Sequence, residues 1–236
     1  MDTSVREKLI AMADSAYLEF TLGLNPDTGT MLGVRIPQLR ILARQIAKSN
    51  WREYLETTQD QYFEEVMLRG MIIGYARIPE QERLELITGF VPVIPGWGIC
   101  DTFCSTLASA KQHRSLYWDF LQPYLSSHNE FELRFAVVML LSHFITGEYI
   151  DRILAILDGI KHDGYYVQMA VAWAVSFCFI KFPEKTLPFL THNTLDDFTF
   201  SRSIQKIVDS YRVDNQTKDM VRFLRRASAG KRTSLL

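Results

Sequence analysis

An internal repeat is the feature that most constrains what this chain can fold into. The segment "FELRFAVVMLLSHFI" (131–145) aligns with "YYVQMAVAWAVSFCF" (165–179) at an offset of 34 in the numbering. The alignment matches Ala136 with Ala170, Val137 with Val171, and Ser142 with Ser176. A helix that is apolar on most of its faces buries them only by stacking on equivalent helices of neighbouring repeats. The repeat therefore predicts an all-α protein, built as a solenoid of helical pairs.

Helical periodicity also dominates the rest of the chain, and no convincing alternating strand pattern interrupts it. We expect helices over residues 4–22, 37–49, 51–57, 61–76, 79–91, 97–110, 114–126, 130–146, 149–161, 165–181, 184–191, 199–211 and 215–228. Pro37, Pro79 and Pro183 stand where a helix can begin. The pattern predicts one repeat domain over 1–228, followed by a disordered tail over 229–236.

Polar side chains near the starts of the long predicted helices recur at the repeat distance. They are Arg69, Asp101, Arg134, Gln168 and Arg202, at successive offsets of 32, 33, 34 and 34 in the numbering. Equivalent positions of successive repeats lie on the same face of a solenoid, so we expect one column along a concave surface. The alternative is a ladder of ion pairs that keeps the repeats in register.

Composition and charge place the chain among ordinary soluble proteins, with 47% hydrophobic and 22% charged residues. Its formal net charge is −1, but nine basic and three acidic residues lie from Arg202 onward, which gives that end +6 and leaves −7 for residues 1–201. A basic end can contact phosphates, or it can be a solvated helix and tail, and charge leaves both interpretations open. The longest nearly uncharged run, 165–180, is too short for a membrane span, so no membrane partner is expected.

Cysteine usage predicts reduced thiols in a cytoplasmic protein. Cys100, Cys104 and Cys178 make an odd number, and the amino terminus lacks the uninterrupted apolar block of a secretory signal. No cysteine or histidine spacing is typical of a zinc site, so we expect no metal.

Several segments together resemble the AlkD family of DNA alkylation repair glycosylases. They are "GWGICD" with its Trp-x3-Asp spacing, "ELRFAV", "YYVQMAVAWAV", "MLGVRIPQLRILAR" (31–44) and "SRSIQKIVDSYRV" (201–213). The resemblance covers nearly the whole chain in order. It implies a right-handed superhelix of HEAT-like repeats whose concave face holds double-stranded DNA. It also implies excision of cationic 3-methyladenine and 7-methylguanine without base flipping and without a cofactor, in a cytoplasmic, nucleoid-associated and monomeric protein.

The resemblance also assigns roles to individual residues. Trp97 and Trp173 match tryptophans that pack against the deoxyribose of the lesion, Asp101 matches the catalytic aspartate, and Arg134 matches an arginine that binds the DNA backbone. Arg69, Gln168 and Arg202, in the same column, are the further expected DNA contacts. Independently of the family, Trp97 and Asp101 stand at i and i+4 and share one helix face. A carboxylate there can stabilise a sugar cation and position water, and indole faces attract cations.

Two other functions remain open on the sequence. Met169 stands where the family often has a lysine, Ala172 replaces a common glycine, and Gly98 and Cys100 depart from the usual residues between Trp97 and Asp101. These departures bear on the strength of DNA binding more than on the catalytic residues. Met169 and the modest net charge favour a non-catalytic HEAT-like module that binds DNA, or a protein-binding scaffold. In those cases Trp173 is a core residue, and Asp101 is a helix cap or the ion-pair partner of Arg134 or Arg69.

Overall fold

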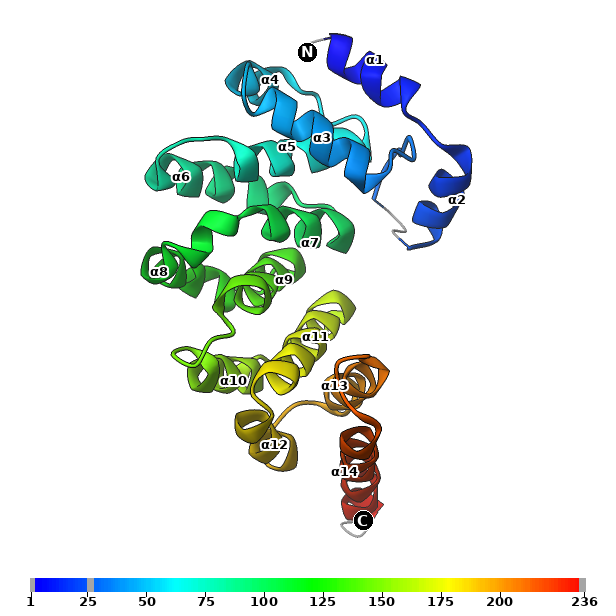
Figure 1. Ribbon diagram of the computed structural model, residues 1–236, viewed down its shortest axis with the longest axis vertical. Helices are drawn as coiled ribbons and strands as arrows, with labels where there is room; N and C mark the ends of the chain where they lie inside the picture. Colours follow the sequence, from blue (N-terminus) through cyan, green and yellow to red (C-terminus); the bar gives the residue numbers. More distant parts are fainter. Residues whose placement is uncertain (1–2, 25–27, 234–236) are drawn as a thin grey trace. The chain divides into compact units, whose positions relative to one another are not determined.

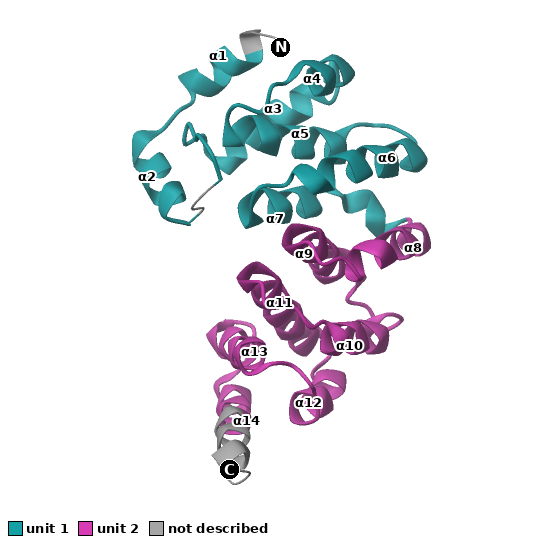
Figure 2. Cartoon of the chain, turned by 180° about the vertical axis from the view of Figure 1, so that it is seen from behind, with its two compact units in different colours: residues 1–112 teal, residues 113–236 magenta. Residues whose placement is uncertain are grey.

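Helices are the regular elements of this chain. The structure, a computed structural model, describes residues 3–24 and 28–233 (Figure 1). Its described side chains are those of 5–24 and 28–224. No strand occurs in these residues, which confirms the predicted all-α class. The chain divides into two compact units, Met1–Gln112 and His113–Leu236 (Figure 2).

The first unit is built around the helix α5. Its elements are α1 (Thr3–Ala11), α2 (Ser15–Leu24), α3 (Ile36–Ile46), α4 (Trp51–Thr57), α5 (Phe63–Tyr75), α6 (Glu80–Phe90), the short 3-10 helix Val91–Val93, α7 (Trp97–Thr106) and the 3-10 helix Ala108–Lys111. The helix α5 packs between α3 and α7, and it also contacts α4 and α6. Alternate helices along the chain therefore form one layer of this unit.

The second unit repeats that arrangement around α11. Its elements are α8 (Arg114–Leu125), α9 (Glu130–Met139), the π-helical segment Leu140–Phe144, α10 (Ile150–Gly159), α11 (Tyr165–Lys181), α12 (Pro183–Thr191), α13 (Asp197–Asp209) and α14 (Asn215–Thr233). The helix α11 packs between α9 and α13 and contacts α10 and α12, while α8 packs on α9. The helix α14 continues to Thr233, beyond the predicted helix end at 228 and into the predicted tail. Residues 234–236 and the side chains from 225 onward lie outside the described part, so for 234–236 the disordered tail stays a prediction.

Core packing explains the repeat in the sequence. Ala136 and Ala170 are fully buried, and Val137 and Val171 are buried at the adjacent repeat position. The helices α9 and α11 pack against each other, and small side chains at buried positions allow helices to pack closely. Matched residues in the sequence are therefore matched core positions.

The amino-terminal prediction was wrong, because one helix over 4–22 is in fact two. The Oδ1 atom of Asp14 accepts a hydrogen bond of 3.0 Å from the backbone N–H of Tyr17. A carboxylate in this position caps a new helix by satisfying one of its free N–H groups, so α2 starts again after the break. The predicted proline starts are confirmed for Pro37, Pro79 and Pro183, which stand within or just before the first turns of α3, α6 and α12.

The three cysteines are free and buried, as predicted. Burial raises the pKa of the Cys178 thiol to about 12, so this sulfur stays protonated at neutral pH. None of the helices in residues 3–24 and 28–233 has both the length and the apolar character that crossing a membrane requires.

Candidate functional site

A cavity at the start of α7 brings together Trp97 and Asp101. It has a volume of about 160 Å³, and both side chains are half-buried at its wall. The other lining residues come from α2, α3, α5, α7 and the loop before α3, and they are Tyr17, Phe20, Thr21, Leu24, Val34, Ile36, Leu39, Phe63, Glu64, Met67, Gly98 and Thr102. The cavity is thus mostly apolar, with a carboxylate and an indole one helical turn apart.

Trp97 is held by a helix far from it in sequence. Its indole Nε1–H donates a hydrogen bond of 2.8 Å to the carbonyl oxygen of Leu24, at the carboxyl end of α2. The last carbonyls of a helix lack partners within that helix, so α2 offers an acceptor where the indole needs one. This bond fixes one edge of the ring and leaves its faces for packing.

Gly96 allows α7 to begin at Trp97. A Cβ atom at residue 96 would lie 2.6 Å from the Cγ2 atom of Thr28, closer than side-chain atoms approach one another. The loop before α7 therefore passes directly against Thr28. The glycine before the tryptophan reflects this close approach between two loops.

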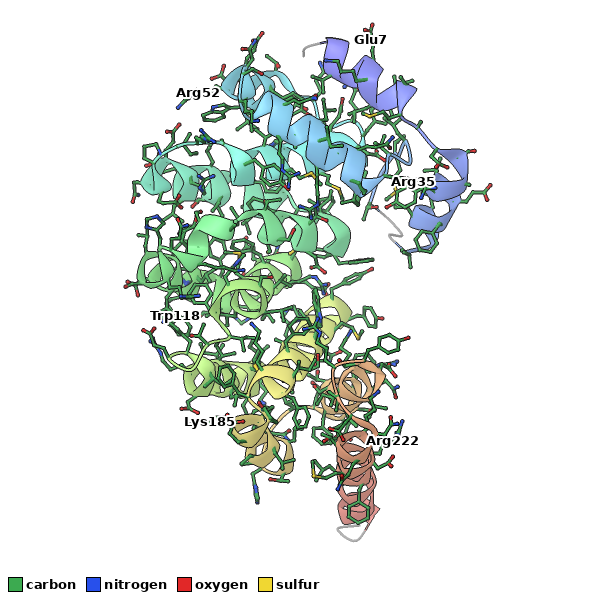
Figure 3. All side chains as sticks on the ribbon, in the orientation of Figure 1. Glu7, Arg35, Arg52, Trp118, Lys185 and Arg222 are labelled. Carbon is green, nitrogen blue, oxygen red and sulfur yellow. The ribbon has the colours of Figure 1, made fainter. Side chains whose placement is uncertain are left out.

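The helix α2 has no fully buried residues, and polar contacts attach it to the first unit. The guanidinium of Arg35 forms an ion pair of 2.8 Å with Asp14 and lies over the Tyr17 ring, 5.0 Å from its centroid (Figure 3). The hydrogen bond from the Tyr17 amide and the pairing with Arg35 lower the pKa of Asp14 below its ordinary value. Asp14 therefore stays charged at neutral pH and keeps α2 at the cavity.

Glu64 is a buried carboxylate at this cavity that sequence reasoning missed. Its Oε1 atom accepts hydrogen bonds from the backbone N–H groups of Gly33 (2.8 Å) and Val34 (3.2 Å), and its Oε2 atom accepts one from Leu32 (3.0 Å). The carboxylate thus fixes the loop before α3. A charged residue inside the apolar segment "FEEVML" was the available signal for it.

Gly33 completes this loop. Its φ of +80° lies in the left-handed region, and a Cβ atom there would be 2.5 Å from the carbonyl oxygen of Asp14. The loop before α3 and the turn before α2 therefore touch through a residue that only glycine fits.

Arg69 is placed in an internal ion pair. Its guanidinium bonds the carboxylate of Asp60 and lies over the Phe90 ring, 5.4 Å from its centroid. Burial raises the pKa of the Asp60 carboxyl, and the charge of Arg69 opposes that rise. Arg69 is not among the residues that line the Trp97 cavity. The ion pair with Asp60 gives Arg69 a structural contact within its own unit, and the alternative in which Asp101 pairs with Arg69 stays a hypothesis.

Arg134 is buried in the second unit, with 5% of its surface exposed. Its Nη1 atom donates a hydrogen bond of 2.5 Å to the carbonyl oxygen of Tyr166, on the neighbouring helix α11. One turn earlier on α9, the Oε1 atom of Glu130 accepts the backbone N–H of the same Tyr166 at 2.6 Å. Two side chains of α9 therefore hold both sides of one residue of α11 and set the register between the two helices.

Trp173 is half-buried, and both its proposed role and its interpretation as a core residue stay predictions. Its ring meets the ring of Phe177 edge to face, with 5.8 Å between centroids. The guanidinium of Arg212 lies over Phe177, 5.0 Å from the ring centroid. Phe177, one turn after Trp173 on α11, is thus a supporting residue that the sequence analysis missed.

Gln168 and Arg202 lie on adjacent packed helices, α11 and α13. Gln168 is half-buried, and Arg202 is exposed with its guanidinium 5.1 Å from the centroid of the Phe198 ring. Of the predicted column, Arg134, Gln168 and Arg202 therefore stand on three successive packed helices of the second unit. Arg69 and Asp101 stand on the packed helices α5 and α7 of the first.

The site residues thus divide between the units. The structure brings Trp97 and Asp101 to one cavity wall in the first unit. It places Trp173 with Phe177 in the second. The joint action of Trp173 with Trp97 and Asp101 on one sugar stays a prediction, as does the single concave column.

Comparison with known proteins fits this arrangement. The family model described as "DNA alkylation repair enzyme" matches residues 5–227 of the 236 in the chain. The chain therefore belongs to the DNA alkylation repair enzyme family. No curated protein matches it significantly.

Proposed function

We propose that this protein is a DNA glycosylase that hydrolyses the N-glycosidic bond of cationic N3- and N7-alkylated purines in double-stranded DNA, without flipping the base. One observation carries the proposal: Trp97 and Asp101 line one cavity wall in a chain of the DNA alkylation repair family. The proposed fold is a single right-handed solenoid of HEAT-like repeats over residues 1–228. The proposed enzyme is monomeric, uses no cofactor or metal, and acts in the cytoplasm at the nucleoid.

The chemistry of an alkylated purine determines what such an enzyme must supply. The base already carries a positive charge, so it departs from C1′ with the bonding electrons and leaves as a neutral molecule. The sugar becomes an oxocarbenium-like cation, which a nearby carboxylate stabilises electrostatically. We assign this role to Asp101.

Water completes the reaction. Its oxygen bonds to C1′, and its proton passes to Asp101 and then to solvent, so the product is an abasic sugar and a free base. The indole faces of Trp97 and Trp173 favour the cationic sugar through their quadrupoles. The bond from Trp97 to Leu24 supports this role, because a ring with a fixed edge presents its face in one orientation.

DNA contacts are proposed for Arg202, Gln168, Arg134 and Arg69. Arg202 is the exposed member of the set, so we assign direct phosphate contact first to this residue. The basic residues that follow it would add to the electrostatic attraction. Four of them, Arg225, Arg226, Lys231 and Arg232, have side chains outside the described part.

A second function is favoured by two contacts. Arg69 bonds Asp60, and Arg134 bonds the Tyr166 carbonyl while nearly fully buried. The first contact holds α5 to the loop before it and the second holds α9 to α11, and such contacts are what a non-catalytic HEAT-like scaffold for DNA or protein requires. In this alternative, Asp101 also serves the fold.

The deciding experiment is single-turnover release of 7-methylguanine and 3-methyladenine from methylated duplex DNA, with protein in excess. The glycosylase proposal expects release well above the spontaneous rate, without added metal. Release at the spontaneous rate, together with salt-sensitive duplex binding, would support the DNA-binding scaffold. Absence of duplex binding even at low salt would leave the protein-binding scaffold.

A further inference from the structure

The starts of three neighbouring helices in the second unit carry a continuous row of aromatic rings. Phe131 begins α9 with Glu130, Tyr165 and Tyr166 begin α11, and Phe198 begins α13 with Asp197. The centroids are 5.4 Å apart for Phe131 and Tyr166, 5.3 Å for Tyr166 and Tyr165, and 5.9 Å for Tyr165 and Phe198. The guanidinium of Arg202 covers Phe198 at 5.1 Å. We call these four rings with Arg202 the aromatic strip.

The strip follows the repeat of the sequence. Tyr165 follows Phe131 at an offset of 34 in the numbering, and Phe198 follows Tyr165 at an offset of 33. Trp97 lies four residues before Asp101, which corresponds to Arg134 at an offset of 33, so the position that corresponds to Trp97 is Glu130, next to Phe131. The recurring aromatic position of the strip therefore comprises Phe131, Tyr165 and Phe198 of the second unit.

Exposure separates the strip from a packing cluster. Tyr165, at its centre, has 54% of its surface exposed, although it contacts rings on both sides. A ring that serves only the core gains its stability from burial, and Tyr165 forgoes half of that gain. Tyr165 adjoins Phe198, which the Arg202 guanidinium covers, and exposed aromatic rings next to a basic group are what proteins use to stack nucleobases.

The carboxylates at the helix starts favour a stacked base over a phosphate at those starts, while Arg202, one turn further along α13, keeps its proposed phosphate contact. The carboxylates of Glu130 and Asp196 accept backbone N–H groups, of Tyr166 at 2.6 Å and of Thr199 at 2.9 Å. They make these helix starts unsuited to a phosphate. Arg202, in contrast, disfavours a basic peptide, because its own charge already occupies the Phe198 face. A nucleobase is neutral and flat, so neither the carboxylates nor the charge of Arg202 disfavours its binding.

We propose that the aromatic strip, centred on Tyr165, is a stacking platform for an unpaired base of the DNA ligand. The proposal rests on the proposed function in so far as it takes DNA as the ligand. It adds a site apart from Trp97, Asp101 and Trp173, and it gives Tyr165 a role in holding an unpaired base other than the alkylated one, which the proposed function leaves unflipped. The site is sequence-tolerant, because every base has a π face.

The test uses a short duplex with one unpaired 2-aminopurine, whose fluorescence falls when it stacks, and the matched duplex without the extra nucleotide. Wild type is expected to bind the bulged duplex about tenfold more tightly than the matched one and to quench the probe. Tyr165→Ala should lose the preference and the quenching, whereas Tyr165→Phe should keep both. Tyr211→Ala is the matched control, since it also removes an exposed ring of the second unit but one outside the strip.

Each outcome is decisive. If wild type binds both duplexes equally and still releases bases, the strip is not a stacking platform, and the proposed function is unaffected. Quenching that survives Tyr165→Ala also overturns the stacking platform. If wild type binds neither duplex, both the stacking platform and the assignment of DNA as the ligand are wrong. Preferential binding of a basic peptide that Tyr165→Ala abolishes, without a bulge preference, would assign the strip to a protein partner.

Discussion

The indole N–H of Trp97 lies 2.8 Å from the carbonyl oxygen of Leu24, 73 residues earlier in the chain, and donates a hydrogen bond to it. The acceptor is at the carboxyl end of α2, a helix that has no fully buried residue and is attached by contacts such as the Asp14–Arg35 ion pair. The orientation of the tryptophan at the cavity therefore depends on a peripheral helix. This dependence can be measured without removing the ring.

Trp97→Phe keeps an aromatic face and removes the bond to Leu24. We expect a small loss of stability, about 1 kcal/mol or less, because water can reach the freed carbonyl. We also expect base release to slow roughly tenfold, since the ring loses its fixed edge. Urea unfolding and single-turnover release measure the two effects. Trp51→Phe is the control, a buried tryptophan that does not line the cavity; an equal slowing there would show that the effect is not specific.

Asp101→Asn tests the catalytic carboxylate. The change keeps the shape of the side chain and removes a negative charge near the proposed phosphates. DNA affinity and fold should therefore persist, while base release slows on the order of 10²-fold or more. Thermal unfolding, duplex binding and release of 7-methylguanine should be compared with wild type.

The structural alternative for Asp101 expects the reverse pattern. If the carboxylate serves as a buried ion-pair partner, its loss should lower the free energy of unfolding by roughly 3 kcal/mol or more. Release would then change only as far as the folded fraction changes. A strongly destabilised variant with unchanged release per folded molecule contradicts the catalytic assignment.

Gly33→Ala tests the contact between the loop before α3 and the turn before α2. Gly29 and Gly33 both have positive φ, of 86° and 80°, but an added Cβ meets nothing within 4 Å at Gly29 and lies 2.5 Å from the carbonyl oxygen of Asp14 at Gly33. Gly29→Ala should cost about 1 kcal/mol for its backbone conformation alone. Gly33→Ala should cost about 3 kcal/mol, because the clash adds to it. Equal costs in urea unfolding would contradict the close approach.

Arg134→Gln and Arg202→Gln form a matched pair. Arg134 is buried against the Tyr166 carbonyl, so its loss should lower stability by about 2 kcal/mol and change the salt dependence of duplex binding less than the loss of Arg202 does. Arg202 is exposed, so its loss should leave stability nearly unchanged and reduce the slope of log K against log salt by about 0.9. If Arg134→Gln instead reduces the salt slope more than Arg202→Gln does, Arg134 is the main phosphate contact.

The sequence determined the helical class, the order of the elements and much of the repeat. Ala136 and Ala170, which the repeat aligns, are equivalent core positions, and α11 spans the predicted residues 165–181. These features are local: apolar periodicity fixes which faces a helix buries, and proline restricts where a helix begins. The placement of Trp97 and Asp101 on one wall follows from the same reasoning, since residues at i and i+4 share a helix face.

Only the tertiary structure decided what the site residues contact. Spacing places Arg69 and Arg134 in a column of polar residues, but their partners, Asp60 and Tyr166, are chosen by how loops and helices pack. The same holds for Glu64, which meets three N–H groups from a distant loop, at Leu32, Gly33 and Val34. A side chain's hydrogen-bond partner depends on distances across the fold, and a linear pattern carries no information on those distances beyond the helix in which the residue lies.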